Sequence, residues 1–125
     1  MSYVPSLTML TLSSFNGKTT GPVKVGTTAN GTQSFYPLIL VTAITSASAI
    51  ITPMTLSLGT NASSYNNLIA ATLMTGLTSL SQMLQTGVTG AVGKVAPGTD
   101  VYINVTSGAT ATTATAEAHL IGYYM

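Results

Sequence analysis

Residues 99–125 read TDVYINVTSGATATTATAEAHLIGYYM, and two alternating patterns within this stretch decide the fold class. In the first pattern, polar residues separate the apolar residues Val101, Ile103 and Val105. In the second, small or apolar residues at positions 114, 116, 118 and 120 alternate with larger, mostly polar ones. A period of two places successive side chains on opposite faces of a β-strand. The stretch therefore predicts two strands, each with one buried face.

The rest of the chain continues this pattern of short strands and frequent turns. Threonine, which favours strands, is abundant, whereas Arg is absent and Glu occurs once. Gly- and Asn-rich segments punctuate the chain at FNGK, TANGTQ, GTNASSYNN, TGVTGAVGK, APGTD and TSGAT. Such spacing is typical of an antiparallel β-sandwich or barrel. We therefore predict an all-β protein.

Two further segments predict strands, and a third is ambiguous. MTLSLGT alternates Met54, Leu56 and Leu58 with polar residues, while FYPLILVTAI (residues 35–44) predicts a central strand covered on both faces. In residues 68–84, apolar residues recur at helical spacing, but Gly76 and several threonines oppose a long helix. We predict two strands broken near Gly76, with one helix as the alternative.

The domain organisation follows from the absence of a linker. A chain of 125 residues fits a single domain. We predict an arm at residues 1–21 that reaches a neighbouring subunit and a sandwich at residues 22–125. MSYVPSLTML lacks the basic and apolar regions of a signal peptide, and the most apolar stretch, residues 38–51, is too short for a membrane span.

Low charge is the most unusual feature of the composition. Only 4% of the residues are charged, against a usual value of about 25%, and the net charge is +1. Lys18, Lys24 and Lys94 are scattered, so the basic patch that nucleic acid or an anionic membrane surface requires is missing. We therefore expect neither partner. So neutral a protein favours self-association.

Glu117 and His119 are the only glutamate and the only histidine, and they lie on the same face of the last predicted strand. One hypothesis makes them a catalytic or metal-binding dyad, which would need a third group, and only Asp100 offers another carboxylate. Asp100 opens a strand after a Pro-Gly turn, where aspartate usually accepts hydrogen bonds from turn amides. We favour the other hypothesis, a polar pair at a contact between subunits.

Tyrosines form the second set of candidate residues. Tyr65, Tyr102, Tyr123 and Tyr124 could stack on sugar rings, but aromatic residues at strand ends also anchor protein interfaces. We predict a subunit interface that includes Tyr102, Tyr123 and Tyr124 together with Glu117 and His119.

Two stretches resemble small capsid decoration, or cement, proteins of tailed bacteriophages. GTDVYINVTSGATATTATAEAHLIGYYM (residues 98–125) is similar to the hairpin that ends these proteins, and ITPMTLSLGTNASSYNNLIAATLMTGL (residues 51–77) is similar to their middle. The resemblance implies a jelly-roll-like β-sandwich that binds the major capsid protein on the virion surface as a homo-oligomer, often a trimer. It supplies no active site, so it implies no enzyme, metal or cofactor.

The sequence thus predicts a structural virion protein. Two alternatives stay open. One is a glycan- or receptor-binding module of a phage fibre or tail that uses its tyrosines. The other is a hydrolase that uses Glu117 and His119.

Overall fold

Eight β-strands form the structure, a computed structural model that describes residues 6–90 and 93–125. Their bounds are β1 (Leu7–Asn16), β2 (Gly21–Thr27), β3 (Phe35–Ser48), β4 (Thr55–Gly59), β5 (Ile69–Leu73), β6 (Met83–Gly87), β7 (Asp100–Ser107) and β8 (Thr113–Tyr124). The described residues contain no helix, and hence none long and apolar enough to cross a membrane.

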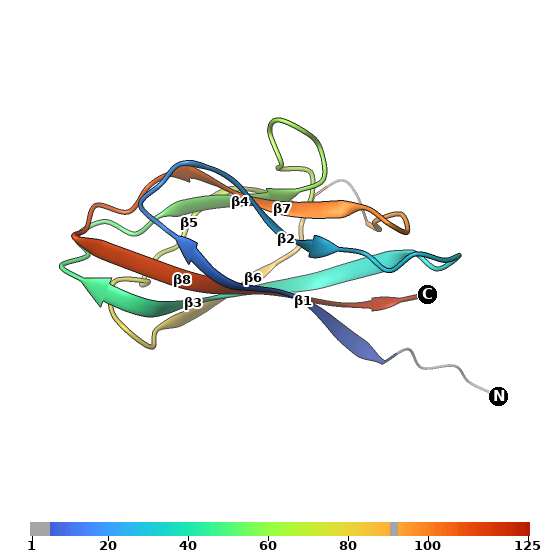
Figure 1. The fold of residues 1–125 in the computed structure, drawn as a ribbon, viewed down its shortest axis with the longest axis horizontal. Helices are drawn as coiled ribbons and strands as arrows, with labels where there is room; N and C mark the ends of the chain where they lie inside the picture. The colour runs from blue at the N-terminus through green and yellow to red at the C-terminus, as the bar shows by residue number, and fades with distance from the viewer. Residues whose placement is uncertain (1–5, 91–92) are drawn as a thin grey trace.

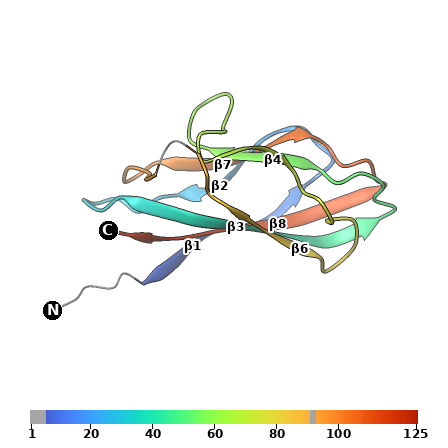
Figure 2. The same ribbon diagram turned by 180° about the vertical axis from the view of Figure 1, so that it is seen from behind.

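The strands form two four-stranded sheets that lie one over the other (Figures 1 and 2). Sheet A has the order β1-β8-β3-β6, and sheet B has the order β2-β7-β4-β5. Every paired strand is antiparallel to its neighbour. The predicted antiparallel β-sandwich is confirmed. The jelly-roll-like description fits this order, because most consecutive strands cross from one sheet to the other.

The core lies between the sheets and is built from the alternating residues that the sequence singled out. The inward side chains of β7 and β8 are at most 1% exposed, and those around β4 are buried with them: Val101, Ile103, Val105, Ala114, Ala116, Ala118, Leu120, Met54, Leu56 and Leu58. Small alanines on β8 leave room for the larger side chains of sheet B. The predicted inward faces of these strands are confirmed.

The central strand β3 differs from its prediction. It lies between β8 and β6, as expected of a central strand. Its inward residues Leu40 and Ile44 are buried, but Leu38 is 47% exposed and Val41 is only half-buried. The prediction that both faces are covered is wrong. The long apolar run reflects a sheet whose outer face is also rich in apolar side chains.

The ambiguous segment forms two strands, as predicted, and the helical alternative is wrong. β5 ends at Leu73 and β6 begins at Met83, with Gly76 between them at a φ of +91°. The helical spacing does not mark one buried face, because Leu77 is buried whereas Leu80 is 59% exposed. A positive φ suits glycine and interrupts regular structure there.

The N-terminal segment belongs partly to the sandwich. Residues 7–16 form β1, an edge strand that pairs with β8, and Phe15 contributes to the core. Residues 1–5 lie outside the described residues. Contact of this segment with a neighbouring subunit stays a prediction.

Candidate functional site

Glu117 and His119 meet on the outer face of sheet A, as their spacing predicted. The Oε2 atom of Glu117 lies 3.6 Å from Nε2 of His119, and the other ring nitrogen, Nδ1, lies 3.2 Å from Oγ1 of Thr11 on β1. Thr11 stands directly beside His119 in the β1–β8 register. Sequence reasoning did not find Thr11, because it is separated from His119 by 108 positions in the sequence and only strand pairing brings the two together.

The order hydroxyl, imidazole, carboxylate is also that of a hydrolytic triad. A triad acts together with N–H donors aimed at the developing oxyanion. On the face of a paired sheet, main-chain N–H groups lie in the plane of the sheet and point to neighbouring strands, so they do not face a substrate above it. The paired strands that carry Glu117 and His119 therefore offer no main-chain N–H donors above this face.

A metal centre finds no support in the described residues either. They contain no cluster of three or more His, Cys, Asp or Glu side chains. Glu117 lies on the outer face of sheet A, whereas Asp100 lies on sheet B, so the two carboxylates cannot share an ion.

The surroundings of the Glu117–His119 pair are apolar. Leu7 and Met9 on β1 are 68% and 52% exposed, and together with Thr8 and Ile121 they line a shallow hollow. The ring of Tyr123 stacks on that of Tyr36 at a centroid distance of 5.2 Å. Contiguous exposed apolar surface is typical of sites that contact another protein.

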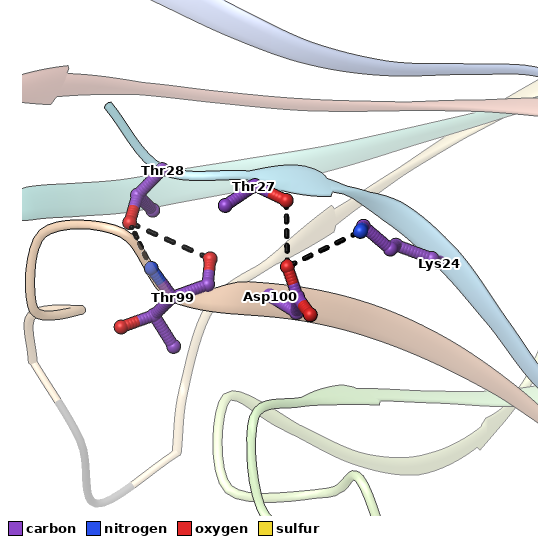
Figure 3. A network of polar contacts seen from close by, with 5 residues as sticks. All are labelled: Lys24, Thr27, Thr28, Thr99 and Asp100. Atoms are coloured by element: carbon purple, nitrogen blue, oxygen red, sulfur yellow. Dashed lines mark hydrogen bonds and ion pairs between the residues drawn. The ribbon is translucent and has the colours of Figure 1, made fainter. Parts of the chain in front are cut away.

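The outer face of sheet B carries a polar network around Asp100 (Figure 3). Asp100 Oδ1 accepts a hydrogen bond of 2.6 Å from Thr27 Oγ1 and lies 3.3 Å from Lys24 Nζ. The hydrogen bond from Thr27 has the largest effect on the pKa of Asp100, and a hydrogen bond from Lys24 has the next largest. Both hold this pKa below its ordinary value. The carboxylate is thus ionised and neutralised locally, which suits a face that meets water.

The turn before β7 is organised by Thr28 and not by Asp100. Thr28 Oγ1 accepts a hydrogen bond of 2.8 Å from the N–H of Thr99 and donates one of 2.7 Å to the carbonyl of Ala96. Figure 3 shows Thr28 against Thr99 beside the Asp100 group. The prediction that Asp100 satisfies the turn amides is wrong, because Thr28, the residue that follows β2, brings a hydroxyl to the turn.

Tyr102 also lies on sheet B, where its ring packs against Tyr65 at a centroid distance of 4.7 Å. Tyr65 belongs to the loop between β4 and β5, which rises beyond sheet B (Figures 1 and 2). The Oδ1 atom of Asn61 accepts hydrogen bonds from the N–H groups of Asn66 and Asn67, and Ser57 donates to the carbonyl of Tyr65. Asparagine side chains thus hold this loop in one shape.

Tyr124 points inward near the end of β8. Its ring packs on Phe35 at 5.1 Å, and its hydroxyl oxygen accepts a hydrogen bond of 2.7 Å from the N–H of Ala29. The five residues predicted for an interface therefore lie in three places. Glu117, His119 and Tyr123 share the outer face of sheet A, Tyr102 lies on the opposite face, and Tyr124 lies at the edge of the core.

No protein-family model and no curated protein matches the sequence. Solved structures do match, along nearly the whole chain. A chain of the cyanophage Pam1 capsid asymmetric unit matches with a TM-score of 0.60 and 18% identity, over 94% of this chain and 83% of that one. A chain of the Ralstonia phage GP4 capsid matches with a TM-score of 0.59 and 14% identity, over 98% of this chain and 90% of that one.

A third match comes from the acid-stable capsid of Helicobacter pylori bacteriophage KHP30. Its TM-score is 0.62 and its identity is 8%, over 98% of this chain and 94% of that one. The fold is similar to that of phage capsid chains. The sequence resemblance to β-sandwich proteins of phage capsids is thus confirmed at the level of the fold.

Proposed function

We propose that this protein is a structural component of a tailed-phage virion, which decorates and cements the capsid by binding the major capsid protein. In this proposal it works as a homo-oligomer, and a trimer is the assembly that the resemblance implies. It is not an enzyme. The observation that carries the proposal is the fold likeness to chains of three phage capsids over 94–98% of this chain.

The difference between the two outer faces supports this role. The sheet A face exposes Leu7 and Met9 and carries the Glu117–His119 pair, whereas the sheet B face carries the Lys24–Asp100 ion pair. We assign the sheet A face to the capsid shell, because contact with a partner would remove its apolar side chains from water. The sheet B face then meets solvent.

Binding to capsid shells that lack the protein tests the proposal. The purified protein is mixed with such shells, the mixture is sedimented, and the shell-bound fraction is measured. We expect saturable binding at a fixed ratio to the major capsid protein and a higher temperature of shell disruption. Absence of saturable binding would overturn the proposal.

Two matched charge variants locate the contact. The double variant Leu7→Glu, Met9→Glu places two carboxylates on the sheet A face, and we expect it to lose shell binding. The double variant Thr19→Glu, Thr20→Glu adds the same charge in the exposed β1–β2 turn and should bind like the wild type. If both variants bind shells as well as the wild type does, the sheet A face does not form the contact.

The Tyr65–Tyr102 pair favours a second candidate function, glycan binding by a fibre or tail module. Two adjoining rings on a polar face, held by a rigid loop, offer a stacking surface for a sugar. A glycan array tests it: saturable binding that Tyr102→Ala abolishes would favour this function. Tyr36→Ala, which removes a ring from sheet A, is the matched control.

A further inference from the structure

The two sheets present four edge strands, and three of them carry features that hinder pairing with another chain. β2 contains Pro22 and Lys24 and has an irregular register between Lys24 and Gly26. β1 has a bulge between Leu12 and Phe15. Proline, lysine and bulges are the usual means by which edge strands avoid pairing with other chains.

β5 is hindered by its own side chains and turn. The hydroxyl of Thr72 donates a hydrogen bond of 2.7 Å to the carbonyl of Ala70, and the N–H of Thr75 donates one of 2.8 Å to the carbonyl of Leu73. The register of β5 against β4 is also interrupted between Leu56 and Leu58. Two carbonyls of this short edge strand are therefore already satisfied.

β6, the fourth edge, has none of these features. Its sequence MLQTG contains no proline and no charge, and its register against β3 runs without a break from Met83 to Gly87. Among the described residues no strand lies beyond it in sheet A.

Two hydrogen bonds show which groups of β6 face outward. The N–H of Ile44 donates to the carbonyl of Gln82, and the N–H of Val88 donates to the carbonyl of Leu38. Residues 82 and 88 therefore point their main-chain groups toward β3. In an antiparallel ladder this direction alternates, so residues 84 and 86 also face β3, while Met83, Gln85 and Gly87 present theirs outward.

We propose that β6 pairs with β6 of a second copy of this chain and extends sheet A across a two-fold axis. Two antiparallel copies related by this axis place Gln85 opposite Gln85, and Met83 opposite the second copy's Gly87. The outward N–H and C=O groups of all three residues then exchange hydrogen bonds. The edge is self-complementary, as a two-fold interface requires.

The side chains fit this register. Met83 is 64% exposed, and a side chain added at Gly87 would meet no atom within 4 Å. The long Met83 side chain therefore has open space above the second copy's Gly87. The pair also brings together two uncharged edges, and the turn before β6 carries a further exposed apolar side chain, Leu80, which is 59% exposed.

This inference shares one assumption with the proposed function, namely that copies of this chain associate with one another. A two-fold contact is compatible with a trimer, because paired trimers form a closed hexamer with both two-fold and three-fold axes. The native mass should then be an even multiple of 12.7 kDa.

The test is light scattering on a sizing column with wild type, Gln85→Pro and Gln85→Thr. Proline removes the outward N–H of Gln85 but no hydrogen bond to β3, so the sandwich should stay folded. We expect the wild type to contain an even number of chains. Gln85→Pro should have half the wild-type mass, and Gln85→Thr should have the wild-type mass. A wild type of one or three chains, or an unchanged mass in Gln85→Pro, would overturn the proposal.

Hydrogen exchange in the wild type supplies a readout that needs no variant. Among the described residues of a single sandwich, nothing pairs with the amide of Gln85, whereas in the pair it is hydrogen-bonded, so it should be protected and lose protection on dilution. Fast exchange at all concentrations contradicts the pairing. Because shell binding is measured separately, a protein that binds shells without β6 pairing would leave the proposed function standing.

Discussion

The hydroxyl of Thr28 and the N–H of Thr99 are 2.8 Å apart, and this hydrogen bond joins the end of β2 to the turn before β7. Thr28 is 2% exposed, so its hydroxyl is satisfied by protein groups and not by bulk water. Thr42 on β3 is 0% exposed, but its hydroxyl has no hydrogen-bond partner among the described residues. Two buried threonines thus have opposite energetic roles.

Replacing Thr28 with valine should destabilise the protein. The change keeps the shape of the side chain but leaves the N–H of Thr99 and the carbonyl of Ala96 without their partner, which costs about 2–3 kcal/mol. Chemical denaturation of Thr28→Val measures the free energy of unfolding. An unchanged value would show that water replaces the hydroxyl.

The same substitution at Thr42 should have the opposite sign. Thr42→Val removes a buried hydroxyl that has no partner and puts a methyl group in its place, so we expect a stabilisation of about 1 kcal/mol. The two valine variants control for each other in one denaturation series. A destabilised Thr42→Val would indicate a hydrogen-bond partner that the described residues do not include.

Asp100 should make stability depend on pH at the acid end. Its pKa is lowered in the folded protein, so its contribution is present above the unfolded pKa of about 3.9 and is lost as pH falls through the lower folded pKa. We expect Asp100→Asn to melt below the wild type at neutral pH and to match it at the acid end. A difference in melting temperature that does not shrink on acidification would contradict this linkage.

The contributions to the Asp100 pKa can be separated by nuclear magnetic resonance titration of the carboxyl group. Thr27→Val and Lys24→Met should each raise the pKa of Asp100, because each removes a hydrogen bond to the carboxylate, and Lys24→Met also removes a nearby positive charge. An unchanged pKa in either variant would contradict the contribution of that residue.

Gly122 on β8 should not tolerate a side chain. A Cβ atom there would contact the carbonyl of Tyr36 and lie 2.7 Å from Cζ of Phe35, so we expect Gly122→Ala to lose about 3 kcal/mol of stability. Gly87→Ala is the control in the same sheet, because a Cβ there meets no atom within 4 Å. Equal stabilities of the two variants would show that β8 and β3 can move apart.

Truncation separates the undescribed N-terminal residues from β1. Removing residues 1–5 leaves β1 and Phe15 in place, so the melting temperature should hold, and any loss of assembly would reveal an arm. Removing residues 1–21 deletes β1 and the buried Phe15 side chain, so it should destabilise the sandwich as well. A stable protein without residues 1–21 would show that β1 is dispensable.

Alternation along single strands let the sequence by itself determine the β class, the inward faces of β4, β7 and β8, and the meeting of Glu117 with His119. These features depend on neighbours within a strand, where a period of two fixes the face of each side chain. In residues 68–84, the spacing of the apolar residues alone favours a helix, but Gly76 and the turn that follows it interrupt regular structure.

Only the tertiary structure decided which strands lie side by side. Thr11 reaches His119, Thr28 reaches Thr99, and Tyr102 and Tyr123 lie on opposite faces because of the order of strands in the two sheets. The position of β6 at the edge of sheet A has the same origin. Pairing between strands distant in sequence depends on the packing of the whole core, and no local pattern in the chain records it.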